Sequence, residues 1–318
     1  MREVTVVIPN YNGAKYLLPC LQALYGHTRT GMDVIVVDNG SKDNTIRDAK
    51  AAFPQVKYIL LDENYGFCRA VNEGIWAADT EYVILLNNDT EILDGFVEHL
   101  LRAIRRSPRI FSVEARMLRY DDPDKLDSAG TYYNAMGWAF ARGRDASAEK
   151  YTRPARTFAA CGGAAIYRKA VFEEIGYFDE RHFAYLEDID VGYRARIYGY
   201  VNLYEPGARV IHVGSASSGS RYNEFKTRYS GRNNIYLIYK NMPLPQILLN
   251  LPFLAAGFFI KGCFFLKKGM GKSYLLSLRE GFRICRKCDR VPVRRSHLLN
   301  YLVIQAELWI NIIRRFAL

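Results

Sequence analysis

Residues 82–90 read Tyr82-Val83-Ile84-Leu85-Leu86-Asn87-Asn88-Asp89-Thr90, an apolar run of strand length that leads directly into two amides and a carboxylate. Three earlier runs rich in Val and Ile have similar lengths, and segments with helical spacing separate them: 4–9, 33–38 and 56–61 for the strands, 14–25, 43–53 and 66–78 for the helices. Strands that alternate with helices predict an α/β fold with a mostly parallel sheet flanked by helices. Because such sheets bind ligands at the carboxyl ends of their strands, the polar residues that end each run form the candidate site.

The first two runs also end in polar residues, Pro9-Asn10-Tyr11-Asn12-Gly13 and Asp38-Asn39-Gly40-Ser41. An acid at the end of the second strand is also found in dinucleotide-dependent oxidoreductases, which need a G-x-G-x-x-G turn after the first strand. Here that turn holds only Gly13, so the sequence argues against an oxidoreductase.

An apolar strand that delivers Asp89 to the sheet edge is suited to holding a hard divalent cation. The same Asn-Asn-Asp run is equally typical of a turn. His212 follows a short apolar run and could bind the same cation, although a lone histidine is more often structural.

Glu187, Asp188 and Asp190 place three acids within four residues at the start of a helix that we expect over 187–198. Acids in the first turn stabilise the positive end of the helix dipole, which accounts for one or two of them. A carboxylate at this position can also act as a general base if it reaches the hydroxyl of an acceptor.

The remaining patterns predict how the chain is divided. Residues 119–157 are more polar and are expected to form an inserted loop region. An apolar run over 158–167, helices over 169–175 and 226–241, and short strands near Val201 and Val210 complete the main domain, over residues 1–242. Residues 243–318 are expected to form a separate apolar, basic helical tail.

The net charge of +11 is concentrated in the tail. Residues 1–260 hold 31 Lys and Arg against 30 Asp and Glu, whereas residues 261–318 hold 13 against 3. A nearly neutral main domain argues against nucleic acid as a partner, and the tail lacks a recognisable nucleic-acid motif. The local excess of positive charge favours an anionic surface.

Two apolar segments of the tail predict contact with a membrane. Residues 244–266 are strongly apolar but contain Pro245, Asn250, Pro252 and Lys261, which weaken a spanning helix without excluding one. Over 298–313, a narrow polar stripe on an apolar helix is typical of a helix in the plane of a membrane surface, and consists of Asn300, Glu307, Asn311 and Arg314. Packing of both segments on the main domain or on another subunit is the alternative.

The six cysteines are interpreted as reduced thiols, several within apolar runs. Cys285 and Cys288 have C-x-x-C spacing, but no second pair or histidine cluster lies near them in the sequence, so zinc is disfavoured. No signal-peptide pattern opens the sequence, and we expect the cytoplasmic face of the cell membrane, with peripheral or monotopic attachment.

Taken in order, these features resemble the family-2 glycosyltransferases with the GT-A fold. The resemblance covers about residues 3–240. It rests on Val6–Asn12, Val37–Ser41, Asn64-Tyr65-Gly66-Phe67 with Asn72, Asn87–Thr90, Gly162-Gly163, Gly176–Glu180, Glu187–Asp190 and His212.

The resemblance implies a role for each matching position. Asp38, Pro9 and Tyr11 would form the pocket for the donor nucleobase. The loop and helix beneath the nucleotide and sugar would include Asn64, Gly66 and Asn72, Asn88 would belong to the donor site, and Gly163 would lie on the acceptor side. Asp89 matches the last acid of the family's D-x-D motif and would bind Mg²⁺ or Mn²⁺ with His212. Because Asn87 stands where the family has the first acid, the affinity for the metal would be modest and would depend on the donor diphosphate and on His212.

The resemblance further implies an inverting reaction with one protein base. Asp188 matches that base, and Glu187 beside it is the less favoured choice. Arg232 is placed to neutralise phosphate, although a structural salt bridge fits it equally well.

The Asn-Asn-Asp-Thr and Glu-Asp-Ile-Asp runs resemble bacterial rhamnosyltransferases of O-antigen, capsule and cell-wall synthesis most closely. This resemblance implies dTDP-rhamnose as the donor, with a UDP-hexose next, and a glycan or polyprenyl-diphosphate-linked saccharide as the acceptor. The alternative is a non-catalytic, membrane-associated protein that binds sugar nucleotides or glycans on the same fold. A homo-oligomer is compatible with either.

Overall fold

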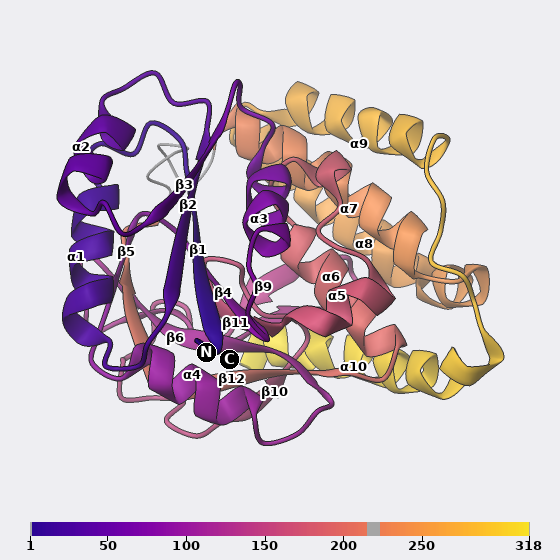
Figure 1. The fold of residues 1–318 in the computed structure, drawn as a ribbon. Helices are drawn as coiled ribbons and strands as arrows, with labels where there is room; N and C mark the ends of the chain where they lie inside the picture. Colours follow the sequence, from indigo (N-terminus) through magenta and orange to yellow (C-terminus); the bar gives the residue numbers. More distant parts are fainter. Residues whose placement is uncertain (1, 215–222, 318) are drawn as a thin grey trace.

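The computed structural model describes residues 2–214 and 223–317, and a ten-stranded mixed sheet forms its centre (Figure 1). Its first half is parallel in the order β3-β2-β1-β4, with bounds Val4–Asn10 for β1, Asp33–Asn39 for β2, Lys57–Leu61 for β3 and Tyr82–Leu86 for β4. The Val and Ile runs of β1 and β4 are buried because helices cover both faces. The predicted α/β fold is confirmed.

Two apolar cores lie on opposite faces of this half. Helices α1 (Leu17–His27) and α2 (Thr45–Ala52) pack on one face, together with α4 (Phe96–Ile104). Helix α3 (Phe67–Trp76) packs on the other face. Alternate residues of β1 and β2 enter each core, as the two-residue period of a strand requires.

The second half of the sheet mixes strand directions. Strand β11 (Ala164–Arg168) is antiparallel to both of its neighbours, β4 and β6 (Ile110–Arg119). Strand β12 (Val201–His212) is parallel to β6 and pairs antiparallel with the short β5 (Thr90–Ile92). Helices α5 (Lys169–Ile175) and α6 (Glu187–Ile197) lie between β11 and β12 in the chain, with the 3₁₀ turn Glu180–His182 between them.

Residues 119–157 differ from the predicted loop region because they contain four short strands. Their bounds are Leu126–Ser128 for β7, Thr131–Tyr133 for β8, Ala139–Ala141 for β9 and Ala155–Thr157 for β10. Strand β7 pairs with β6 and β10 pairs with β12, so the region extends the main sheet. Strands of three residues are too short to give a detectable alternation in the sequence.

The last four helices are α7 (Glu224–Asn241), α8 (Leu244–Lys267), α9 (Gly271–Cys285) and α10 (Leu298–Ala317), the last preceded by a 3₁₀ turn, Arg295–His297. They lie together beside α6, on one side of the sheet (Figure 1). The inner faces of α8 and α10 share an apolar core with α6 and β8, which includes Tyr133, Tyr193, Leu254, Ile304 and Leu308. Within the described ranges, α8 alone is long and apolar enough to cross a membrane by length and composition, and 17% of its most apolar window is buried.

Candidate functional site

Hydrogen-bonded polar side chains join the carboxyl ends of β4, β1 and β2. The Asn88 Nδ2 donates to Asn10 Oδ1 (2.7 Å), and the Asn10 Nδ2 donates to Asp38 Oδ1 (2.8 Å). The Ser41 hydroxyl donates to the same Asp38 oxygen (2.5 Å). Gly13 is needed beside them, because a Cβ there would lie 2.2 Å from Asn10 Oδ1 and 2.3 Å from Asn88 Nδ2. The structure thus brings the predicted Asp38 and Asn88 together through Asn10, whose role the sequence pattern did not indicate.

Asn39 holds the loop over 64–66 against the end of β2. Its Nδ2 donates to Asn64 Oδ1 (3.0 Å) and Gly66 O (3.1 Å), and its Oδ1 accepts from the Tyr65 N–H (2.9 Å). Gly66 has a φ of +86°, and a Cβ there would lie 2.6 Å from the Phe183 carbonyl oxygen. The predicted Asn64 and Gly66 therefore lie beside the end of β2 and against the loop that precedes α6.

Asp89 and His212 come together because β5 and β12 pair with Thr90 opposite His212. The distance from Asp89 Oδ1 to His212 Nε2 is 3.5 Å. On the other side of the ring, His212 Nδ1 lies 2.8 Å from Oδ2 of Asp127, a residue of β7. Burial lowers the pKa of His212, but hydrogen bonds to Asp127 and Asp89 outweigh it and raise the pKa to about 9. The ring is therefore protonated near neutral pH without a cation, and a bound cation would replace the proton on Nε2.

Asp89 and His212 offer a cation one carboxylate oxygen and one imidazole nitrogen, and this donor pair is compatible with Mg²⁺ or Mn²⁺. Among residues 2–214 and 223–317, no group of three His, Cys, Asp or Glu side chains could hold a metal ion. Mg²⁺ is commonly held by one or two carboxylates together with substrate phosphates and water. Two protein donors therefore fit a cation that is completed by a diphosphate.

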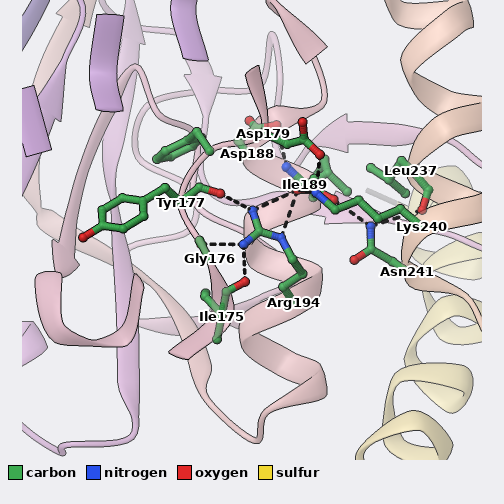
Figure 2. A network of polar contacts seen from close by, with 12 residues as sticks. Ile175, Gly176, Tyr177, Asp179, Asp188, Ile189, Arg194, Leu237, Lys240 and Asn241 are labelled. Atoms are coloured by element: carbon green, nitrogen blue, oxygen red, sulfur yellow. Dashed lines mark hydrogen bonds and ion pairs between the residues drawn. The ribbon is translucent and has the colours of Figure 1, made fainter. Parts of the chain in front are cut away.

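The last acid of the cluster at the start of α6 is structural. Asp190 is fully buried, and its carboxylate lies 2.9 Å from Arg194 Nη2, 2.9 Å from Lys240 Nζ and 2.8 Å from Asn241 Nδ2. Arg194 also donates to the backbone carbonyls that precede Asp179, and Lys240 reaches Asp179 as well (Figure 2). Burial alone would raise the pKa of Asp190, but the two cations hold it well below its usual range.

Asp188 and Glu187 have no such partners. Neither forms an ion pair with any residue in the described parts of the chain, and Glu187 Oε2 has no hydrogen-bond partner there. The Ile189 N–H donates to Asp188 Oδ1 (2.7 Å). Burial raises the pKa of both carboxyls, and the negative charge of Asp188 raises the pKa of Glu187 further. An unpaired carboxylate with a raised pKa can accept a proton from a substrate.

The loop before α6 has an unusual backbone that one asparagine supports. The Asn233 Nδ2 lies 2.8 Å from His182 O, 2.8 Å from Ala184 O and 2.7 Å from Tyr185 O. Three residues of this loop have left-handed backbone angles: Phe183, Tyr185 and Leu186. Bulky residues rarely adopt these angles, and such strain is concentrated at functional sites. The chain therefore fixes the start of α6 at some cost.

Residues 161–163 lie between the Asp89 pair and the start of α6. The Asn87 N–H donates to Gly163 O (2.9 Å), and the Cys161 N–H donates to Glu114 Oε2 (3.2 Å). Burial raises the pKa of Glu114 to about 7, and the charge of Asp188 adds to this effect. The predicted Gly163 is thus held against the end of β4, while Glu114 on β6 is an acid that the sequence pattern did not indicate.

The model of the family described as Glycosyl transferase family 2 matches residues 5–176, more than half of the chain. The chain belongs to this family. A curated relative from Mycobacterium tuberculosis, an N-acetylglucosaminyl-diphospho-decaprenol L-rhamnosyltransferase, is 29% identical over 240 residues, which cover 67% of this chain and 77% of the relative. The predicted resemblance to family 2 and to bacterial rhamnosyltransferases is confirmed.

Solved structures establish the GT-A fold of this glycosyltransferase. GalNAc-T7 with UDP, GalNAc and Mn²⁺ has a TM-score of 0.60 at 17% identity, covering 75% of this chain and 48% of that one. The mannosyltransferase PcManGT from Pyrobaculum calidifontis, with GDP-Man and Mn²⁺, has a TM-score of 0.52 at 17% identity and covers 97% and 85%. The chain thus spans about half the length of GalNAc-T7 and most of PcManGT.

The remaining predicted residues of the glycosyltransferase lie around this edge with different surroundings. Pro9 pairs in register with Val37, and Tyr11 is 38% exposed beyond the end of β1. Asn72 is buried, and its amide bonds the backbone of Phe178 in both directions (2.8 and 3.1 Å), so it holds α3 against the segment before α6. Arg232 has no acidic partner among the described residues; its guanidinium donates to Arg181 O (2.7 Å) and His182 O (2.8 Å) and lies over the Tyr229 ring.

Proposed function

We propose that this family-2 glycosyltransferase moves a sugar from a nucleoside-diphosphate donor to a hydroxyl of an acceptor, with inversion at the anomeric carbon and Asp188 as the base. The observation that carries the proposal is the contrast within one helical turn: Asp190 is neutralised by Arg194 and Lys240, whereas Asp188 has no cationic partner in the described chain. A partly buried carboxylate without a partner is costly, so a purely structural role does not explain why Asp188 is left unpaired.

The donor would lie along the carboxyl ends of β1, β2 and β4. Asp38, oriented by Asn10 and Ser41, would accept a hydrogen bond from the nucleobase, and Tyr11 would lie beside the base. The loop of Asn64 and Gly66 would support the ribose and sugar, as the resemblance implies. The Asn10–Asn88 hydrogen bond supports this placement because it fixes the edge at which such sheets bind ligands.

Asp89 and His212 would hold the divalent cation, which supplies positive charge to the departing diphosphate. Asp188 would take the proton from the acceptor hydroxyl as that oxygen attacks the anomeric carbon from the face opposite the diphosphate. One carboxylate base is then sufficient, because the leaving group needs charge compensation rather than a proton. Arg232 would add charge compensation only if its guanidinium left the carbonyls of Arg181 and His182.

The substrate assignment rests on the relatives. The M. tuberculosis relative is named for L-rhamnosyl transfer to an N-acetylglucosaminyl-diphospho-decaprenol, so we propose dTDP-rhamnose as donor and a polyprenyl-diphosphate-linked saccharide as acceptor. A UDP-hexose is the next donor to test, since a structural neighbour was crystallised with UDP.

A direct test combines calorimetry with a transfer assay. Titration with dTDP, UDP and GDP, with and without Mn²⁺, identifies the nucleotide, and the matching sugar nucleotides are then offered with a GlcNAc-diphospho-lipid acceptor. Asp188→Asn should lose transfer by about 10²–10⁴-fold while binding the nucleotide as the wild type does. Glu187→Gln, the matched control at the neighbouring position, should lose far less. Equal losses in the two variants, or transfer that persists in Asp188→Asn, would refute the assignment of the base.

A further inference from the structure

Helix α8 buries polar side chains and exposes apolar ones, which is the reverse of the pattern in helices of soluble domains. Its buried positions include two amides and a glycine: Gln246, Asn250 and Gly257, with Leu254 between them. Its exposed positions are almost entirely apolar, and the large ones are Leu244, Leu248, Leu249, Leu251, Phe253, Phe259, Ile260, Phe264 and Leu266. In water this arrangement exposes apolar surface and buries polar groups, which is the reverse of ordinary amphipathic packing.

The polar face of α8 is bound to the protein along its length. The Asn250 Nδ2 donates to Gln305 Oε1 (2.7 Å), and the Gln305 Nε2 donates back to Asn250 Oδ1 (2.8 Å). The Trp309 indole N–H also donates to Asn250 Oδ1 (3.0 Å). Toward the other end of the helix, the Lys261 Nζ donates to Gly137 O (3.2 Å). These contacts join α8 to α10 and to the loop before β9.

Helix α10 has the same inverted pattern. Asn300 donates to Ile197 O (2.9 Å) and Asn311 donates to Tyr133 O (2.8 Å), while Glu307 pairs with Arg196. Its outer surface carries large apolar side chains that are 41–72% exposed: Leu298, Leu299, Leu302, Val303, Trp309, Ile310, Ile313 and Phe316. The predicted polar stripe therefore faces the catalytic domain, and the apolar remainder faces outward.

The positive charge of the tail favours an anionic bilayer over a second copy of the chain as the partner of this surface. Residues 261–318 hold 13 Lys and Arg against 3 Asp and Glu, so a symmetric dimer through these helices would bring two strongly positive tails together. On α9, Arg279 and Arg283 are exposed, as is Arg286 directly after the helix, and none of the three forms an ion pair within the described residues. Leu275, Leu276 and Phe282 of α9 are exposed among them. Interspersed basic and apolar side chains fit lipid headgroups and the outer acyl region.

We propose that the outer faces of α8 and α10 form one monotopic docking face, on which α8 lies in the plane of an anionic membrane and does not cross it. A crossing α8 would have to leave the domain, so that Gln246, Asn250 and Lys261 would face lipid and Gln305 would lose its partners. Docking through the outer faces buries the exposed apolar side chains and leaves every one of these hydrogen bonds in place.

Vesicle flotation of the full chain tests the docking face. Wild type should bind vesicles that contain phosphatidylglycerol, and Phe259→Glu/Leu302→Glu should lower the partition coefficient at least tenfold. Leu60→Glu on β3, an equally exposed leucine away from these helices, should bind as the wild type does. The proposal would be overturned if the double variant bound vesicles as the wild type does. It would also be overturned if the wild type failed to bind vesicles and instead formed a dimer that the double variant lost.

Cysteine labelling tests the orientation of α8. Leu244→Cys and Leu266→Cys place thiols at the two ends of the helix, and the background from native cysteines is measured in the unsubstituted chain. In sealed membrane vesicles, a membrane-impermeant maleimide should label both positions from the same side. Labelling from opposite sides would show that α8 crosses the membrane and would overturn the monotopic arrangement.

A separate observation concerns Asp127, whose carboxylate lies behind His212. His212 Nδ1 is 2.8 Å from Asp127 Oδ2, while Nε2 points toward Asp89 at 3.5 Å. Arg144 lies 3.1 Å from the other Asp127 oxygen and fixes the carboxylate. Metal-binding histidines commonly donate their second N–H to a carboxylate, which sets the ring orientation and the tautomer.

We infer that Asp127 is a positioning residue that keeps the His212 proton on Nδ1, so that the Nε2 lone pair faces the cation site. This inference rests on the proposed metal pair of Asp89 and His212. Strand β7, which carries Asp127, would then contribute to the site, although the sequence predicts a loop over residues 119–157.

The test measures Mn²⁺ affinity by electron paramagnetic resonance and, with diamagnetic Mg²⁺ in place of Mn²⁺, the His212 tautomer by ¹⁵N NMR, both in the presence of nucleoside diphosphate. Asp127→Ala should weaken Mn²⁺ binding about 10–100-fold and alter the tautomer, whereas Asp122→Asn, a partly exposed acid of the same segment that pairs with Lys125, should change neither. Unchanged affinity and tautomer in Asp127→Ala would overturn the inference alone. Absence of Mn²⁺ binding in the wild type would overturn the metal pair as well.

Discussion

Replacing Asp190 by asparagine should destabilise the protein strongly without touching the acceptor chemistry. The change removes the charge that neutralises Arg194 and Lys240 in a fully buried position. Breaking a buried ion pair by removing one partner typically costs 3–5 kcal/mol. Here Lys240 keeps Asp179 at 2.7 Å and Arg194 keeps three backbone carbonyls (Figure 2), so we expect the lower end, about 3 kcal/mol.

Thermal unfolding followed by circular dichroism measures this loss. With an unfolding entropy of roughly 2 cal/mol/K per residue over 318 residues, a loss of 1 kcal/mol lowers Tm by roughly 1.5 °C, so Asp190→Asn should lower Tm by roughly 4–5 °C. The sign of the pH dependence follows from the depressed pKa of Asp190 in the folded state. Its stabilisation is complete above the unfolded-state pKa of about 3.9 and is lost as the pH falls below it. The gap between wild type and variant should therefore be constant from about pH 5 to 8 and narrow in stronger acid.

The matched variant is Asp188→Asn, two residues earlier on the same helical turn. Because Asp188 has no cationic partner among the described residues, its loss should change Tm by less than about 2 °C, while transfer falls. A drop in Tm of less than about 2 °C for Asp190→Asn, or equal drops in both variants, would contradict the division into a structural and a reactive acid.

Three further predictions concern the site. Transfer should decline on the acid side at a pH above that of an ordinary carboxylate, because burial raises the pKa of Asp188 and the protonated acid cannot act as a base; a pH profile of kcat/KM measures this decline. Glu187→Gln should leave the decline in place, because the pKa of Glu187 is raised further than that of Asp188 and Glu187 is already neutral where Asp188 titrates. Gly13→Ala should weaken nucleotide binding at least tenfold in calorimetry, because its Cβ would strike both Asn10 and Asn88, and wild-type affinity would contradict the proposed donor edge. A chelator should abolish transfer and Mn²⁺ should restore it; full activity after exhaustive chelation would rule out the metal requirement.

The parallel half of the sheet was predictable because its strands are buried on both faces. Such strands read as continuous runs of Val, Ile and Leu, and β4 is a run of this kind. The region of β7 to β10 was not predictable for the opposite reason. Its strands have three residues each, and much of its buried surface comes from alanine and tyrosine, so no period appears in the sequence.

The positions of Asp38, Asp89 and Asp188 were predictable from the sequence, because each lies where an apolar strand ends or a helical pattern begins. Residues that organise these groups gave no signal. Asn10 and Asn233 act through hydrogen bonds to partners 28 and about 50 residues away in the chain, and only the fold brings the partners together. An asparagine next to a turn is also the residue type that turns favour, so its role cannot be distinguished from local turn formation in a single sequence.

The orientation of α10 shows why an amphipathic pattern alone cannot say which face of a helix is buried. A narrow polar stripe on an apolar helix does not show whether the polar face or the apolar face points away from the protein. Helices that lie at a membrane interface usually turn their polar face toward water. In this chain the catalytic domain presents the backbone carbonyls of Tyr133 and Ile197 to α10, and the asparagines of the stripe donate to them. Because buried polar groups need hydrogen-bond partners, the domain binds the polar face of α10, and the apolar face points outward, where we propose that it contacts a membrane.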